Sequence, residues 1–410
     1  MQIDAHMTEQ RTFWTLVIAA AAILAVTMGI RQSLGLFVSP LNTSTGLGIV
    51  AISLAMAIAQ FTWGLAQPLF GMLADRVSAF KVIVIGTLLL AAGLALTPFV
   101  SSQAGLIFSI GLLTAVGAGA GSFSILIGAV AAKLPAERRS FAAGFINAGG
   151  SFGQFIFAPL SQALIHSFNW INAMLILACA SLCSIAMAMP LRDKPEASKQ
   201  PSAKADEGIT LGQQLRIAFK DRSYWCLHIG FFTCGFHIAF LVTHLPGEVN
   251  LCGLTPTVGA TSLAIIGLSN VAGSLYAGWL GQTRRMKMIL FWMYASRAIA
   301  VAAYLATPKT PWTFYLFAAV LGFTWLSTVP PTAGLVGKLF GPRYLATLFG
   351  FTLLSHQIGG FFGAWLGGLV FYANGSYVWM WCGDIVLAVL AALANLPIRE
   401  IKPADQTPPR

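Results

Sequence analysis

Charged residues are scarce in this chain, and their scarcity excludes a soluble protein. Asp, Glu, Lys and Arg make up 9% of its 410 residues, whereas 57% of the residues are hydrophobic. A soluble globular domain carries about 25% charged residues. The mean hydropathy of +0.77 indicates instead a chain whose outer surface faces lipid.

The sequence also lacks the patterns that enzymes and metal proteins need. Its six cysteines are not spaced as metal ligands beside histidines, so neither a zinc site nor a disulfide framework is predicted. No glycine-rich loop stands between a strand and a helix, where nucleotide phosphates bind. No apolar run carries paired carboxylates or a nucleophile next to a base. We therefore predict that the chain is not an enzyme and uses no metal or cofactor.

The sequence does contain long apolar runs. A run of about 18 or more apolar residues is long enough to cross a bilayer as a helix. Twelve such runs are present, which predicts an all-α polytopic membrane protein with twelve transmembrane helices. They are Phe13–Phe37, Ile49–Leu73, Val82–Phe99, Leu106–Ala131, Phe141–Ile165, Trp170–Met189, Tyr224–Leu245, Val258–Leu280, Met288–Leu305, Trp312–Leu335, Thr347–Tyr372 and Val378–Leu396.

The net charge of +11 does not point to nucleic acid, because the Lys and Arg residues are unevenly distributed. If the first residues are cytoplasmic, all but three of the 24 Lys and Arg fall on the cytoplasmic side, the three being Arg31, Arg297 and Lys309. This bias orients membrane proteins, so we predict two cytoplasmic termini. The first run is too long for a signal peptide, and we expect it to stay in the protein, in a bacterial inner (plasma) membrane.

The apolar runs form two sets of six around a polar segment. Residues 191–221 are rich in Lys, Pro, Ser and acidic residues, a composition typical of a linker or a short amphipathic surface segment. We predict six-helix bundles at 1–190 and 222–410. Short motifs recur between them at an offset of about 206 residues, which indicates an internal duplication. The matching pairs are Gly71 with Gly278, Lys133 with Lys338 and Gly144 with Gly350.

One of these motifs resembles a family signature. The stretch Gly71-Met72-Leu73-Ala74-Asp75-Arg76, followed by Lys81, resembles the cytoplasmic loop of the major facilitator superfamily, whose layout of six helices plus six covers the whole chain. Two positions depart from the family pattern. Ser78 stands where a glycine is usual, and Leu113 stands four residues before Gly117, where an arginine is usual. The resemblance implies two pseudo-symmetric bundles that alternate in exposing a central site to the two sides of the membrane.

The resemblance also implies a gating role for the loop residues Gly71, Asp75, Arg76 and Lys81. In the family arrangement Asp75 lies against the start of the eleventh helix, near Leu345–Thr347, where the helix dipole favours a carboxylate by about 0.3–1 kcal/mol. Such a contact can hold the cytoplasmic side closed. The alternative is an ordinary pair of solvated loop charges.

Arg31 places a positive charge inside the first apolar run, at a cost of about 2.5–3.5 kcal/mol near a bilayer centre. The offset between the halves makes His237 its equivalent in the seventh run. The resemblance implies that helices 1, 4, 7 and 10 line the central cavity, so we predict that Arg31 binds a carboxylate there and that His237 exchanges a proton. The alternatives are an arginine that reaches the headgroups or a buried partner, and a histidine that only packs.

Two further charges lie inside apolar runs. Arg297 and Asp384 both fall near mid-span in the second half, and buried charges usually neutralise one another. We predict a structural ion pair between them. The alternative is a proton relay through Asp384.

Several uncharged residues complete the predicted site. Pro330 and Pro331 lack amide donors and are expected to bend the tenth helix, freeing the carbonyls of Leu326 and Ser327. Glycines at a spacing of four, in the fifth helix and in the eleventh, are expected to form surfaces along which the bundles slide, or to serve packing alone. The side chains predicted to contact substrate, besides Arg31 and His237, are Trp325, Asn147, His356 and Gln357.

These features predict a monomeric secondary active transporter that moves a small organic anion, a monocarboxylate, with a proton. Within the superfamily the chain is most similar to the bacterial monocarboxylate-porter and oxalate/formate-antiporter branch, through its cavity arginine and the stretch Ser355-His356-Gln357-Ile358-Gly359. The alternatives are transport of a siderophore or another larger organic anion, and export of a drug or metabolite.

Overall fold

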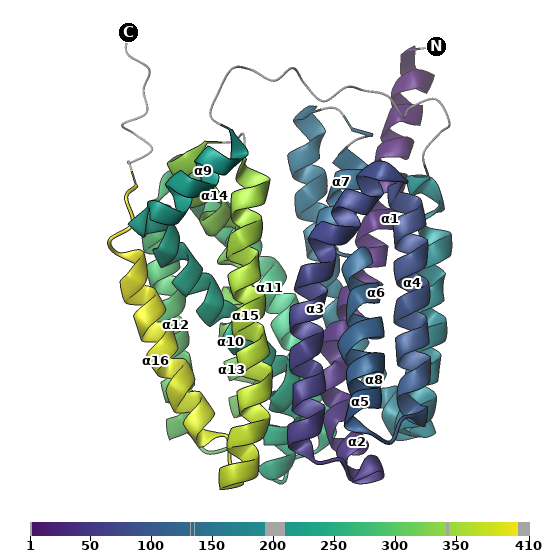
Figure 1. The fold of residues 1–410 in the computed structure, drawn as a ribbon, viewed down its shortest axis with the longest axis vertical. Coiled ribbons are helices and arrows are strands. Elements are labelled where there is room, and N and C mark those ends of the chain that lie inside the picture. The colour runs from purple at the N-terminus through teal and green to yellow at the C-terminus, as the bar shows by residue number, and fades with distance from the viewer. Residues whose placement is uncertain (1, 132, 135, 193–209, 342–343, 401–410) are drawn as a thin grey trace. The chain divides into compact units, whose positions relative to one another are not determined.

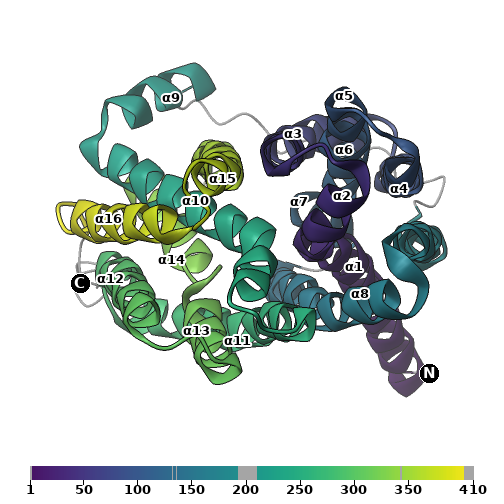
Figure 2. The ribbon, with the colours of Figure 1, turned by 90° about the horizontal axis from the view of Figure 1, so that it is seen from below.

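The computed structural model describes residues 2–131, 133–134, 136–192, 210–341 and 344–400. Its regular structure over these residues consists of helices without a strand, as predicted. The chain separates into two compact units, Met1–Gln200 and Pro201–Arg410, whose helices are labelled in Figure 1 and seen from below in Figure 2. Residues 193–209 of the predicted linker lie outside the described residues, and the remainder contains a short amphipathic helix.

The first unit contains long helices and several short helical segments between them. In chain order they are α1 (Gln2–Ser33), η1 (Leu34–Phe37), α2 (Val38–Thr45), α3 (Ile49–Arg76), α4 (Ala79–Leu96), η2 (Thr97–Phe99), α5 (Gln103–Leu106), the π-helix η3 (Ile107–Thr114), α6 (Ala115–Ala120), α7 (Phe123–Ala131), α8 (Ala136–Met187) and η4 (Met189–Leu191).

The second unit begins with the amphipathic helix and continues with long helices. They are α9 (Leu211–Lys220), α10 (Arg222–Leu251), α11 (Pro256–Thr283), α12 (Met286–Ala306), α13 (Pro311–Thr324), α14 (Val329–Phe340), α15 (Leu345–Asn374) and α16 (Val378–Asn395).

Ten helical stretches of the described residues are long and apolar enough to cross a membrane. One of them, Ala142–Leu191, contains two predicted runs, because α8 turns at Asn169, whose φ of 67° is left-handed. α15 is not among the ten, but its 30 residues exceed the length that a bilayer requires. With these two corrections, each predicted run coincides with a helical stretch, which in some cases is divided into shorter helices.

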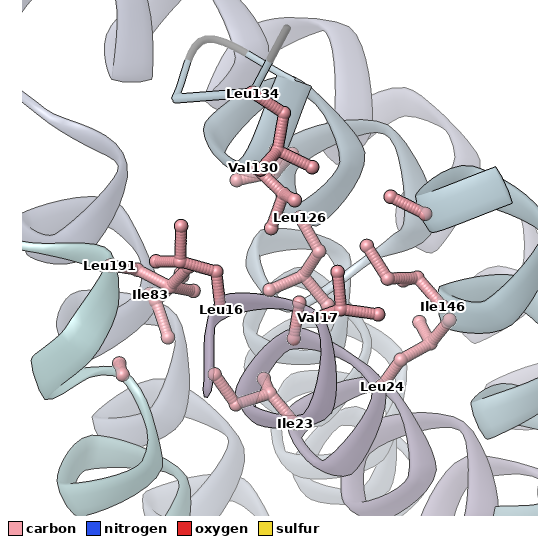
Figure 3. Packing of buried hydrophobic residues seen from close by; sticks show 14 of the residues in the cluster. Leu16, Val17, Ile23, Leu24, Ile83, Leu126, Val130, Leu134, Ile146 and Leu191 are labelled. Atoms are coloured by element: carbon pink, nitrogen blue, oxygen red, sulfur yellow. The ribbon is translucent and has the colours of Figure 1, made fainter. Parts of the chain in front are cut away.

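A buried apolar cluster fixes α1 in the first unit (Figure 3). It joins α1 to α4, α7 and α8 through fully or nearly fully buried side chains. This packing stabilises the position of α1, since truncating one buried Leu or Ile side chain to alanine costs about 2–5 kcal/mol. The cluster therefore holds the helix that carries Arg31. Its labelled members are Leu16, Val17, Ile23, Leu24, Ile83, Leu126, Val130, Leu134, Ile146 and Leu191.

The two units repeat the same glycine contact, which supports the predicted duplication. A Cβ atom on Gly29 of α1 would lie 2.7 Å from the carbonyl oxygen of Gly153 on α8. At the equivalent place in the second unit, a Cβ atom on Gly235 of α10 would lie 1.8 Å from the carbonyl oxygen of His356 on α15. Arg31 and His237 follow these glycines by two residues, so they occupy equivalent places on equivalent helices.

The same contacts bear on the predicted sliding surfaces. Gly149 and Gly153 pack against α1 of their own unit, and Gly359 and Gly363 pack against Phe232 and Phe236 of α10, also within one unit. Helices approach closely where small residues face each other. Both glycine stripes are thus occupied by neighbours inside their own bundles, which favours the packing interpretation over sliding.

We predict that Gly235→Ala destabilises the protein far more than Gly350→Ala. The new methyl group of Gly235→Ala meets backbone at 1.8 Å, whereas a Cβ on Gly350 of α15 has nothing within 4 Å. Overpacking costs about 1–3 kcal/mol or more, while an open helical glycine gains up to about 1 kcal/mol from alanine. Thermal unfolding of the purified variants measures the difference, and equal melting temperatures would contradict the close approach of α10 and α15.

Candidate functional site

Arg31 lies in the last turn of α1 and is held by α3. Its Nη2 donates a hydrogen bond to Oε1 of Gln60, and its guanidinium lies 3.9 Å from the centre of the Trp63 ring. Gln60 and Trp63 are three residues apart and so share one face of α3. The Arg31 side chain is partly exposed, between the buried residues Ile30 and Gln32.

Neither partner of Arg31 neutralises its charge. Gln60 is an uncharged amide, and a ring face attracts a cation by about 0.5–2 kcal/mol without cancelling it. Among the described side chains no carboxylate pairs with Arg31. The alternative of a buried neutralising neighbour thus has no support in this part of the chain. A guanidinium fixed on one edge in this way keeps its other N–H groups available for a planar anion.

The second unit contains a buried pair of titratable groups. Nδ1 of His237 on α10 forms a hydrogen bond with Oδ2 of Asp384 on α16, and the two side chains are 1% and 0% exposed. A carboxylate so placed orients the imidazole ring. His237 therefore has a buried carboxylate as its partner, and its role in proton exchange stays a prediction.

Arg297 does not pair with Asp384, contrary to our prediction. Its Nη2 donates to the backbone carbonyls of Thr324 and, at 2.6 Å, of Trp325, and its Nε donates to Oγ1 of Thr324 at 3.3 Å. These groups lie where α13 ends. The guanidinium thus satisfies a helix end, whose last carbonyls have no partner within the helix, while Asp384 is taken by His237.

The predicted break in the tenth helix is present, but the carbonyl of Leu326 is not left free. α13 ends at Thr324 and α14 begins at Val329. The amide of Val329 bonds to the carbonyl of Leu326, three residues back, at 3.0 Å. Leu326 thereby gains the partner that Pro330 cannot supply, and the carbonyl of Trp325 is left for Arg297.

Side chains from two more helices secure this break. Oδ1 of Asn270 on α11 accepts a hydrogen bond from the amide of Leu326 at 2.9 Å. The thiol of Cys234 on α10 donates to the carbonyl of Trp325 at 3.5 Å and lies equally far from Oγ1 of Thr328. The break is consequently a preformed feature of the second unit. The sequence shows the prolines, but it does not show which side chains replace the lost helix bonds.

Four buried polar atoms around this centre have no hydrogen-bond partner among the described residues. They are Nε2 of His237, Oδ1 of Asp384, Nη1 of Arg297 and Nε2 of His356, on α10, α16, α12 and α15 respectively. Buried polar atoms without any partner are rare in folded proteins. These four atoms, with the charged groups of Arg297 and Asp384, make this part of the second unit a buried polar centre.

The other predicted site residues are spread over both units. Trp325 is buried and its ring meets that of His237 edge-on at 6.4 Å. His356 packs edge-on against Phe231, and its Nδ1 lies 3.4 Å from Nε2 of the buried Gln357. Asn147 is half-buried on α8. None of these arrangements requires a ligand, so their contact with substrate stays a prediction.

The predicted gating residues are described in part. Gly71 lies in α3, and Lys81 lies at the start of α4, where its amide donates to Oγ of Ser78 at 3.3 Å. The side chains of Asp75 and Arg76 lie outside the described ones. Their role stays a prediction.

Comparisons with known proteins agree on one family. A family model described as Major Facilitator Superfamily matches residues 18–364. Monocarboxylate transporter 13 of Rattus norvegicus is 25% identical over 397 residues, which cover 94% of this chain and 89% of the relative. The oxalate:formate antiporter of Oxalobacter formigenes is 21% identical over 369 residues, with 87% and 84% covered.

Other matches span almost the whole chain. The uncharacterized MFS-type transporter YcxA of Bacillus subtilis (strain 168) is 22% identical over 416 residues, covering 98% of both chains. Among solved structures, a bacterial homolog to the human lysosomal transporter Spinster, in an inward-facing and unoccupied conformation, gives a TM-score of 0.70 at 14% identity, with 94% and 95% covered. This structural likeness concerns the fold alone.

We predict that Asp384 is coupled to His237 more strongly than to Arg297. Side chains in direct contact show coupling energies of about 0.5–3 kcal/mol in double-mutant cycles, and only His237 contacts Asp384 directly. The cycles combine Asp384→Asn with His237→Gln and, as the matched comparison, with Arg297→Gln, and they measure unfolding of the purified protein. A larger coupling for Arg297 would restore the ion pair expected from the sequence.

Proposed function

The chain belongs to the Major Facilitator Superfamily, and from this premise we propose that it transports a small organic anion, a monocarboxylate, together with a proton. Its family and its named relatives are transporters and not enzymes. The chain is accordingly an integral membrane protein that carries a small substrate across a bilayer. The proposal concerns the chemistry of that substrate and the ion that drives its movement.

The proposal that the substrate is an anion rests on the environment of Arg31. Its guanidinium is partly exposed and is held by an amide and a ring, so its full charge remains for a ligand. A carboxylate matches the fork of a guanidinium in shape and charge. Two relatives, a monocarboxylate transporter of the rat and an oxalate:formate antiporter of Oxalobacter, support the same substrate class at 21–25% identity.

The pair of His237 and Asp384 supports proton coupling. A histidine titrates near neutral pH, and burial beside a carboxylate gives its charged form one strong partner. Protonation adds a positive charge to a buried centre that already contains Arg297. Such a change in charge can bias the unit between two conformations, which is what coupling to transport requires.

The remaining features follow from the superfamily and from the charge distribution. We place the protein in a bacterial inner membrane as a monomer, with both termini in the cytoplasm. The bundles at 1–190 and 222–410, joined by the segment 191–221, alternate in opening the site to each side of the membrane. Asp75, Arg76 and Lys81 control the cytoplasmic side.

We predict that Arg31→Gln weakens binding of the preferred anion by about 10- to 100-fold, because a hydrogen bond to a charged group contributes roughly 1.5–3 kcal/mol and each 1.4 kcal/mol is about tenfold. The measurement is the shift in melting temperature of the purified protein with acetate, lactate, pyruvate, oxalate and a ferric siderophore. Uptake of the best ligand into proteoliposomes with an imposed pH gradient then tests transport.

Two matched variants control this experiment. Arg31→Lys keeps the charge but lacks the planar fork, so it is expected to lose part of the effect. Arg11→Gln removes an exposed arginine from the same helix and is expected to bind like the unmodified protein. Equal stabilisation of Arg31→Gln and the unmodified protein by the best carboxylate would overturn the anion site, and a response to the siderophore alone would overturn the monocarboxylate.

A further inference from the structure

Titratable residues continue along α10 beyond His237, towards the end of the helix. His244 and Glu248 follow at seven and eleven residues, and at 100° per residue these spacings place all three on one face. α16 packs against α10. Its residues Trp381 and Asp384, and the preceding N-cap residue Tyr377, follow one another at spacings of four and three and lie on the same side. We call these two rows of residues, His237, His244 and Glu248 on one side and Tyr377, Trp381 and Asp384 on the other, the polar stripes. They extend side by side from the His237–Asp384 pair to one end of the second unit, where the connections 252–255, 307–310 and 375–377 lie.

The two stripes are joined by hydrogen bonds. His237 bonds to Asp384 at the inner end. Two turns along, Nε2 of His244 bonds to the carbonyl of Ala364 at 2.8 Å, and Nδ1 lies 3.3 Å from the hydroxyl of Tyr377. Because a carbonyl can only accept, Nε2 carries the proton, and the Tyr377 hydroxyl donates to Nδ1 of the neutral ring. Polar groups thus link α10 and α16 at two levels.

Glu248 forms the outermost level. It is 9% exposed, three residues before the last residue of α10. Its Oε1 accepts a hydrogen bond from the Tyr304 hydroxyl of α12 at 3.0 Å. Its charge also acts on Tyr377 and Cys252. A carboxylate buried at the end of a membrane helix, beside water, is placed to collect protons.

The charge of Lys309 acts on this carboxylate. Its Nζ lies 3.9 Å from the centre of the Tyr304 ring and bonds to the Tyr304 carbonyl. Burial lowers the pKa of Lys309, and the negative charge of Glu248 opposes that decrease. The two groups therefore stabilise each other's charges, and a proton that neutralises Glu248 removes a charge that favours the Lys309 ammonium.

We propose that Glu248 receives the proton that drives transport and that the contact between α10 and α16 conducts it to His237. The proposal rests on the proton coupling proposed above. In the predicted topology this end of the unit faces the outside. The Glu248 carboxylate takes a proton from hydronium and leaves water, and the proton then passes along water and the polar groups of the stripes. At the inner end it forms the His237 imidazolium, which the Asp384 carboxylate stabilises, and Glu248 returns to its charged form.

An aromatic contact interrupts the path between Glu248 and His237. Glu248 and His237 are eleven residues apart, about 16 Å along a helix, and between them the Phe240 ring packs against Trp381 with ring centres 4.7 Å apart. An apolar contact of this kind excludes water. Proton uptake at Glu248 and delivery to His237 are therefore separate steps, and a small rotation of either aromatic side chain joins them.

The test follows protonation of the His237–Asp384 pair without any substrate. Purified full-length protein in lipid nanodiscs is subjected to a drop in pH, and infrared difference bands that are absent from Asp384→Asn report on the pair. We predict that Glu248→Gln slows their appearance by about tenfold or more, since a positioned proton donor or acceptor contributes roughly 10²–10⁴-fold. Glutamine keeps an acceptor for Tyr304 but cannot take a proton.

A purely structural role for Glu248 makes a different prediction. Tyr304→Phe removes the hydrogen bond that ties Glu248 to α12 but leaves the carboxylate, so it is expected to protonate the pair within about twofold of the normal rate. If Glu248→Gln protonates the pair at the normal rate, or if Tyr304→Phe slows it as much, the path is overturned. The path is equally overturned if no bands of the pair appear between pH 4 and pH 9.

A second measurement separates this inference from the proposed function. In proteoliposomes, Glu248→Gln is expected to lose uptake of lactate driven by an external acid pH but to retain exchange of labelled for unlabelled lactate, which moves no net proton. If the unmodified protein transports no carboxylate, the proposed function fails while the infrared result still decides the proton path. If Glu248→Gln retains the driven uptake, the path fails while the function stands.

Discussion

The compensation of charge inside the membrane is the constraint on which this structure depends. Each buried charge costs about 2.5–3.5 kcal/mol or more near the bilayer centre unless neighbouring groups stabilise it. Arg297 is stabilised by the carbonyls of a broken helix, and Asp384 by the imidazole of His237. Arg31 differs from both, since the partners described for it are a neutral amide and a ring. A bound anion would neutralise the charge of Arg31.

The duplication explains how these two kinds of charge came to correspond. Gly29 allows α1 to approach α8 closely, and Gly235 allows α10 to approach α15 closely. Arg31 and His237 each follow two residues after these glycines. One fold position therefore carries a fixed charge in the first unit and a titratable group in the second. The proposed mechanism assigns the anion to the first and the proton to the second. Whether the two side chains meet in one cavity stays a prediction.

Much of this architecture could be predicted from the sequence, because apolar runs and repeated motifs are local properties. The twelve runs correspond to helices, and the equivalence of Arg31 and His237 follows from the motif offset alone. The break before Val329 was also visible, because prolines cannot donate.

The sequence could not show which groups contact each buried charge. Two opposite charges at mid-span suggested that Arg297 pairs with Asp384, but Arg297 lies beside the carbonyls left at the end of α13, and Asp384 lies beside His237. The spacing of the glycines predicted close contacts between helices, but it did not show which helix faces each row of glycines. Glu248 lies three residues beyond the run Tyr224–Leu245, and only its contact with Tyr304 of α12 shows that it is buried among other helices.

The central claim is that anion binding and proton binding occur at separate charged groups of one carrier. Calorimetry of carboxylate binding at pH 7, repeated in buffers of different ionisation enthalpy, measures the protons taken up with each anion. The account predicts proton uptake by the unmodified protein and anion binding without proton uptake by His237→Gln. Proton uptake that persists in His237→Gln, or anion binding by the unmodified protein with no proton at all, would contradict it.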